Sequence, residues 1–191
     1  DTDGIPISFS IYPGNRNEQL TMIPLEEKML SSFDMSKFIV CTDAGLSSAS
    51  NRVFNTYDNT DGMRGYITTQ SLKTLKGFLQ KWCMADDGWT LDGDTSGKKY
   101  KLSELDNDLD KDKIFYKTRW MKEEGRVHTK NGDKKQVIEQ KLIVSYSIKY
   151  RNFMRHIREG QLERARKLVV SGEKTINKKK QNDPKRFIRT D

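Results

Sequence analysis

The chain has 191 residues and a net charge of +8, with 35 Lys or Arg residues against 27 Asp or Glu residues. Hydrophobic residues make up 34% and charged residues 32%, so we expect a core confined to a few elements with solvated stretches between them. No run approaches the roughly 18 apolar residues of a membrane span, and the first residues lack a secretory pattern. These features predict a soluble, cytoplasmic protein with no membrane partner.

The positive charge is concentrated at one end of the chain. Residues 146–191 hold fourteen Lys or Arg against five Asp or Glu, a balance of +9, which leaves residues 1–145 near −1. A polyanion such as DNA is a natural partner for this segment, and an ordinary solubilising tail is the alternative. The two cysteines, Cys41 and Cys83, stand in apolar surroundings and are predicted to be buried free thiols of a reducing compartment.

The first part of the chain alternates strand and helix patterns. Residues 5–12 alternate apolar and polar side chains, which predicts a strand with one packed face. A helix should follow from Pro24, with apolar residues at helical spacing: Leu25, Met29 and Phe33. The unbroken run "KFIVCT" predicts a central strand covered on both faces, as in a parallel sheet.

Asp43 follows that run directly. A short helix toward Phe54 and a strand at "RGYITTQSLK" come next, so the order predicts an α/β sheet in which this strand is parallel to the one before it. In open α/β sheets, functional polar residues are concentrated at the carboxyl ends of the strands. A carboxylate there can hold a divalent cation, act as a nucleophile, or cap a turn through backbone N–H groups.

From about residue 75 the pattern changes. A short helix around "TLKGFLQKWCM" leads into a polar loop, and two strands then flank Asn131-Gly132, a hairpin signal. A long helix over residues 147–171 should close this region. We expect the apolar side of this helix to pack against the rest of the protein, and the adjacent stripe of arginines to stay available to a partner. The apolar residues are Tyr150, Phe153, Met154, Ile157, Ala165 and Leu168. The arginine stripe is Arg151, Arg155, Arg158 and Arg166.

The acidic loop repeats half of a calcium-binding pattern. Asp92, Asp94, Ser96 and Gly97 match the first half of an EF-hand loop, but Ser103 stands where the bidentate Glu belongs, which favours a solvated loop. We interpret His128 and His156 as surface residues. The tryptophans are predicted to anchor the core, with base stacking as the alternative: Trp82, Trp89 and Trp120.

Two stretches, "DTDGIPISFSIYPGNRNEQLTMIPLEEKM" and "FIVCTDAGLSSASN", together resemble a DDE-class bacterial insertion-sequence transposase with a ribonuclease H-like catalytic domain. Such enzymes have a "PGN" turn, a helix, and a buried strand that ends in an "ADAG" type motif. Here that motif is Thr42-Asp43-Ala44-Gly45, with threonine for the usual alanine. The resemblance covers residues 1–75 well and is looser beyond them.

The resemblance implies that Asp43 is the second member of an acidic triad that holds two Mg²⁺ or Mn²⁺ ions for phosphoryl transfer on DNA. It also implies that the first member lies upstream of Asp1. Glu159 is a candidate for the third, because Asn152, Arg155, Glu159 and Arg166 imitate the spacing of a Tyr-x2-Arg-x3-Glu-x6-Lys pattern, and an ordinary ion pair on the helix surface is the alternative. The implied partners are the transposon ends and target DNA, bound by a homodimer at the bacterial nucleoid.

We therefore expect part of a transposase with a partial ribonuclease H-like core, a mixed sheet with flanking helices, and a β-rich insertion closed by a long helix. The expected parts are a core segment over residues 1–75, an insertion subdomain over 76–171 and a basic segment over 172–191. Candidate DNA-binding residues are Arg151, Arg155, Arg158, Arg166, Lys178, Lys179 and Lys180. The alternatives are a DNA-binding module without catalysis and a phosphotransfer enzyme with Asp43 as nucleophile.

Overall fold

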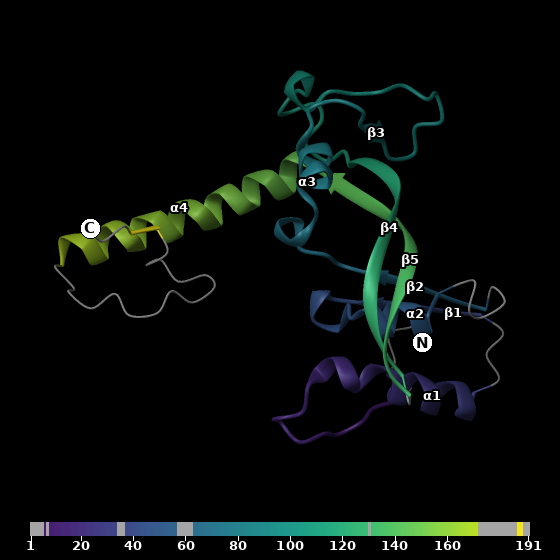
Figure 1. Ribbon diagram of the computed structural model, residues 1–191. Helices are drawn as coiled ribbons and strands as arrows, with labels where there is room; N and C mark the ends of the chain where they lie inside the picture. Colours follow the sequence, from purple (N-terminus) through teal and green to yellow (C-terminus); the bar gives the residue numbers. More distant parts are fainter. Residues whose placement is uncertain are drawn as a thin grey trace. The chain divides into compact units, whose positions relative to one another are not determined.

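The computed structural model describes residues 6, 8–33, 37–56, 63–129, 131–171 and 187–188. The fold is mixed α/β, as expected, with two sheets and several helices (Figure 1). It divides into two compact units, which are described separately: the first unit comprises residues 1–84 with 119–142, and the second comprises residues 85–118 with 143–191. Within the described residues, no helix combines the length and apolar character that a membrane crossing requires.

The first unit carries a small parallel sheet and short helices. Its strands pair in register from Phe38 opposite Arg64 to Thr42 opposite Thr68, which confirms the predicted parallel arrangement. The elements up to residue 84, in chain order, are η1 (Glu18–Leu20), α1 (Met22–Ser32), β1 (Phe38–Thr42), η2 (Ala44–Leu46), α2 (Ala49–Phe54), β2 (Arg64–Thr68), η4 (Leu72–Thr74) and α3 (Gly77–Met84).

Strand β1 is packed on one face only, so the prediction of cover on both faces is wrong. Ile39 is 67% exposed and Cys41 is also exposed, whereas Phe38 and Val40 are half-buried. The cause is that β1 and β2 form a two-stranded sheet, and the described residues place no second layer against the outer face. The prediction that Cys41 is buried fails for the same reason, while Cys83 is buried as expected.

The predicted strand at residues 5–12 does not form over the described residues 8–12. Phe9 is 75% exposed and Ile11 is 86% exposed, because no neighbouring strand in the described part offers this segment hydrogen-bonding partners. The helix that follows is present as α1. Its buried side chains are Met22 and Glu26, rather than the apolar series that the spacing predicted.

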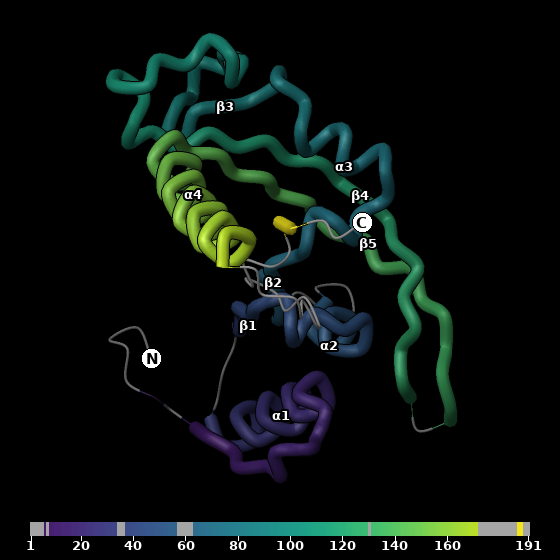
Figure 2. Tube along the Cα trace, turned by 90° about the vertical axis from the view of Figure 1, so that its left-hand side faces the viewer, coloured from purple at the N-terminus to yellow at the C-terminus, as the bar shows by residue number. Residues whose placement is uncertain are grey.

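A long hairpin contributes residues to both units. Strands β4 (Phe115–Thr129) and β5 (Gly132–Tyr146) are neighbours in a three-stranded sheet, and Figure 2 shows them running side by side along their length. Gly132 has φ +103°, the left-handed conformation that the predicted Asn131-Gly132 turn requires. The hairpin prediction is therefore confirmed.

The second unit packs around Trp89, which confirms one predicted core anchor. Trp89 is 2% exposed, its ring lies 5.9 Å from that of Tyr146, and Lys117 Nζ sits 4.4 Å above it. Trp120, in contrast, is 64% exposed. Besides its share of the hairpin, this unit contains β3 (Thr90–Leu91), η5 (Leu102–Glu104) and α4 (Ile148–Val170).

Helix α4 forms where residues 147–171 predicted it, but much of its predicted docking side is exposed. Tyr150, Phe153 and Met154 are 64%, 57% and 44% exposed, because the described residues bring no surface against them. The buried positions of α4 are Ile148, Gln161 and Ala165.

Candidate active site

Asp43 stands between strand β1 and the 3-10 turn η2. Its backbone is extended, and its Oδ1 accepts a hydrogen bond from the Gly45 N–H over 2.9 Å. The side chain therefore caps η2, which is one of the three roles predicted for it. The residue is exposed, and Oδ2 has no hydrogen-bond partner among the described residues. The carboxylate thus combines a fixed orientation with one oxygen open to a ligand.

The parallel pairing of β1 and β2 explains why Asp43 is held in this position. The Thr42 hydroxyl donates to Thr68 Oγ1 over 3.2 Å, and the Thr68 hydroxyl donates to the backbone oxygen of Asp43 over 3.1 Å. The Thr69 N–H also donates to the Thr42 carbonyl over 3.3 Å. Asp43 is therefore tied to the carboxyl end of the neighbouring strand, the edge where α/β sheets carry polar groups.

The small residue two positions after Asp43 leaves room for the carboxylate. A Cβ atom added at Gly45 would lie 3.1 Å from Asp43 Oδ1, closer than an ordinary van der Waals contact. Glycine at this position therefore lets the Asp43 side chain fold back over its own cap.

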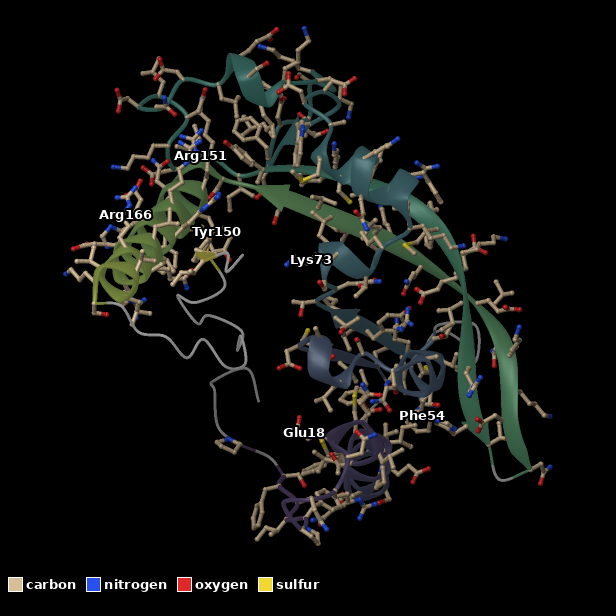
Figure 3. All side chains as sticks on the ribbon, turned by 60° about the vertical axis from the view of Figure 1, so that its left-hand side comes forward. Glu18, Phe54, Lys73, Tyr150, Arg151 and Arg166 are labelled. Carbon is tan, nitrogen blue, oxygen red and sulfur yellow. The ribbon has the colours of Figure 1, made fainter. Side chains whose placement is uncertain are left out.

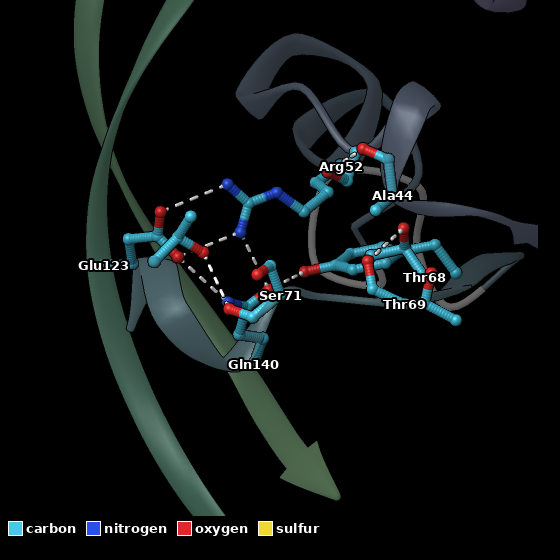
Figure 4. Close-up of polar contacts among 10 residues, drawn as sticks. Ala44, Arg52, Thr68, Thr69, Ser71, Glu123 and Gln140 are labelled. Atoms are coloured by element: carbon cyan, nitrogen blue, oxygen red, sulfur yellow. Dashed lines mark hydrogen bonds and ion pairs between the residues drawn. The ribbon is translucent and has the colours of Figure 1, made fainter. Parts of the chain in front are cut away.

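Four polar side chains near α2 form a connected network that the sequence patterns did not predict (Figure 4). The Arg52 guanidinium pairs with both carboxylate oxygens of Glu123, at 3.1 and 3.3 Å, and it also donates to Gln140. The Tyr66 hydroxyl donates to the same Gln140 oxygen. Burial raises the pKa of the Tyr66 hydroxyl, and Glu123 adds to the rise while Arg52 opposes it.

The candidate DNA-binding arginines lie on α4, where Arg151 and Arg166 are labelled in Figure 3. Arg151 is engaged: its guanidinium donates to Asn107 over 2.6 Å and to the Tyr146 hydroxyl over 3.1 Å. The other three arginines are exposed. Within the described ranges no side-chain hydrogen bond or ion pair forms at Arg155 or Arg158. The candidate residues Lys178, Lys179 and Lys180 lie outside the described residues.

The triad candidate Glu159 is exposed on α4, in the second unit, whereas Asp43 belongs to the first. In the acidic loop, Asp94 accepts hydrogen bonds from the Ser96 N–H and the Tyr100 hydroxyl. The pKa of Asp94 is lowered, mainly by its hydrogen bonds with Ser96. Over the described ranges, no three or more His, Cys, Asp or Glu side chains gather as a metal site would need.

A scan of protein-family models, a search of curated proteins and a search of solved structures each found no match to this chain.

Proposed function

We propose that the chain is part of a DNA transposase that carries out metal-dependent strand cleavage and strand transfer of an insertion sequence, with Asp43 as a catalytic, metal-binding carboxylate. The observation that supports this proposal is the placement of Asp43 at the carboxyl end of a parallel strand pair, exposed and with Oδ2 open. The motif Thr42-Asp43-Ala44-Gly45 supports it from the sequence.

A carboxylate oxygen is a hard ligand that suits Mg²⁺ or Mn²⁺, and Asp43 fits the role of one such ligand. The metal ions would activate water or a DNA 3′-hydroxyl and stabilise the leaving oxygen. Asp43 alone is one ligand of the expected set, so this chain by itself should bind metal weakly and cleave no DNA. The partners that we propose are transposon ends and target DNA, with a homodimer as the active form at the bacterial nucleoid.

The second candidate is a DNA-binding module without catalysis, in which Asp43 only caps η2. The observation that favours it is the exposure of Arg155 and Arg158 on α4, where they are available to phosphate groups. Both candidates predict DNA binding, so the distinction depends on strand cleavage.

The deciding experiment replaces Asp43 with Asn in the complete transposase and measures Mg²⁺-dependent cleavage of a labelled duplex that carries the element ends. Asn keeps an oxygen acceptor for the Gly45 N–H, so the cap survives while the anionic ligand is lost. We expect cleavage to fall by about a hundredfold or more, since even indirect partners of metal ligands are worth roughly 10- to 100-fold. Duplex affinity should stay within about twofold, because Asp43 is not a phosphate-binding cation.

Asp94→Asn is the matched control, because Asp94 makes the same type of bond to the N–H two residues later, over 2.8 Å. Full cleavage activity in Asp43→Asn would contradict the enzyme proposal and leave the DNA-binding module. A stable beryllofluoride adduct that depends on Asp43 would instead support a phosphotransfer enzyme.

A further inference from the structure

We propose that Arg52, Tyr66, Glu123 and Gln140 are positioning residues that hold Asp43 in place through the two elements adjoining it. This inference rests on the proposed function of Asp43, but the network itself lies wholly in the described residues of the first unit. None of its members touches the Asp43 carboxylate, so each would act through another residue.

Gln140 is the point where the network converges. Its Oε1 accepts from the Tyr66 hydroxyl over 2.8 Å and from Arg52 over 3.1 Å, while its Nε2 donates to Glu123 over 3.1 Å (Figure 4). Arg52 and Glu123 complete the cycle with their paired contacts. A side chain of the hairpin strand β5 therefore connects β2, through Tyr66, with α2, through Arg52.

Both β2 and α2 form a hydrogen bond to Asp43 or to the turn that it caps, close to these network residues. Tyr66 precedes Thr68 by two positions on β2, and Thr68 donates to the Asp43 backbone. On the other side, the Asn51 side chain next to Arg52 donates to the Leu46 carbonyl over 2.9 Å, at the end of the turn that Asp43 caps. Thr68 and Asn51 therefore support Asp43 and its turn from two sides. The network joins β2 to α2 close to both residues, at Tyr66, two positions from Thr68, and at Arg52, next to Asn51.

The hairpin also packs closely against α2, and Figure 1 shows it passing this helix. A Cβ atom at Gly125 would lie 2.6 Å from the Cβ of Ala49, so only glycine permits this approach. Three residues away on β4, the His128 N–H donates to Ser50 Oγ over 2.9 Å. The hairpin therefore contacts α2 at three points: Ala49, Ser50 and Arg52.

The chemistry of the network favours a fixed geometry over simple adhesion. The side chains of Arg52 and Glu123 are 10% and 30% exposed, so their pairing is largely removed from water. A guanidinium and a carboxylate that share two contacts hold one mutual orientation, which apolar packing would not impose. Removing one partner leaves the other charge without compensation, so the orientation of α2 depends on the intact set.

The test uses Tyr66→Phe and Gln140→Leu in the full chain, with the Gly45 amide as an NMR probe. This amide reports directly on the bond to Asp43 Oδ1. We expect its chemical shift to change and its hydrogen exchange to accelerate roughly three- to tenfold, as the loss of a typical hydrogen bond would produce. Tyr100→Phe, which removes a matched hydroxyl contact to Asp94 in the second unit, should leave Gly45 unchanged.

A Gly45 amide that stays unchanged in Tyr66→Phe, with thermal stability lowered as in Tyr100→Phe, would overturn the inference. If Gln140→Leu does not fold, Tyr66→Phe decides alone, because it removes a single hydroxyl. In the complete transposase, Tyr66→Phe should also raise the Mg²⁺ concentration needed for half-maximal cleavage, which a purely structural variant would not do. Altered Gly45 together with normal cleavage by Asp43→Asn would remove the proposed function but leave the network as a determinant of Asp43 geometry.

Discussion

The Thr68 hydroxyl donates a hydrogen bond to the backbone carbonyl of Asp43 over 3.1 Å and connects the ends of two parallel strands. Thr42 stands directly opposite Thr68 and donates to it in turn. The backbone of Asp43 is thus held by a chain of hydroxyl groups, while its side chain is held separately by the Gly45 N–H.

Thr68→Val should weaken this arrangement, because valine has the same shape but cannot donate to Asp43. We expect the free energy of unfolding to fall by about 1 kcal/mol, the net value of one hydrogen bond, measured by urea denaturation. Thr42→Val is the control, since it leaves the Thr68 hydroxyl free to donate to Asp43. The Gly45 amide should shift in Thr68→Val more than in Thr42→Val, and the reverse order would contradict the assigned direction of these bonds.

Gly45→Ala should displace the Asp43 carboxylate with little effect on stability. The added methyl group would lie 3.1 Å from Oδ1, so the carboxylate must move by a few tenths of an ångström. Under the proposed function, cleavage by the complete transposase should fall at least about tenfold, because misplacement of a reacting group is costly. Gly14→Ala is the control, since nothing lies within 4 Å of a Cβ at that position. Equal activity in both variants would argue against a role for Asp43 geometry.

Gly125→Ala should loosen the packing of the hairpin against α2. The new Cβ would lie 2.6 Å from Ala49 Cβ and 3.1 Å from Ile138 Cδ1, which forces a shift costing about 1–3 kcal/mol. The double variant Gly125→Ala with Ala49→Gly should recover part of that loss, because it removes the closest contact. A thermodynamic cycle of the three variants measures the coupling, and strict additivity would show that the two residues do not meet.

Stability should also depend on pH through Glu26, a buried side chain of α1. Burial is the main cause that raises its pKa above 4.5, against the opposing effects of the Asn55 hydrogen bond and of Arg64. The folded state therefore binds the Glu26 proton more tightly than the unfolded state does, so stability falls as pH rises from 4.5 through the raised pKa.

Glu26→Gln isolates this effect, because it keeps an oxygen for Asn55 and removes the titrating group. Several exposed carboxylates titrate as well, so the informative quantity is the difference in unfolding free energy between the variant and the unmodified chain. We expect that difference to shift in favour of Glu26→Gln as pH rises from 4.5 through the raised pKa of Glu26, measured by urea denaturation. A difference that stays constant over this range would show that Glu26 ionises normally in the folded chain.

Local patterns were enough to predict β1, β2, their parallel pairing and the place of Asp43 between strand and turn. They failed where long-range neighbours decide burial. The run "FIVCT" suits a strand covered on both faces, but Ile39 and Cys41 are exposed because the described fold has no second layer there. An apolar run predicts what a strand can bury, and its neighbours decide what it does bury.

The network around Gln140 was missed for a related reason. Arg52 lies 71 residues from Glu123 and 88 from Gln140, so no local period or motif links them. Charged and amide side chains are normally assigned to solvated faces. The available signal was indirect: Gly125 interrupts a strand, and a glycine within a strand often marks the close approach of another segment.

The arginines of α4 differ in their surroundings. Arg155 and Arg158 are exposed and make no ion pair with described residues, so they can neutralise phosphates. The double variant Arg155→Gln with Arg158→Gln should reduce the slope of log affinity against log salt by about 2, since each phosphate that a cation neutralises adds roughly 0.9 to that slope. Fluorescence anisotropy with a labelled duplex at several salt concentrations measures this slope.

Arg151→Gln is the contrasting variant, because Arg151 is occupied by Asn107 and Tyr146. This substitution should lower the free energy of unfolding by about 1–2 kcal/mol while leaving the salt slope nearly unchanged. If Arg151→Gln changed the slope as much as the double variant, DNA would have to displace Asn107 and Tyr146 from the guanidinium. If neither variant changed it, the phosphate-binding surface would lie away from these α4 arginines.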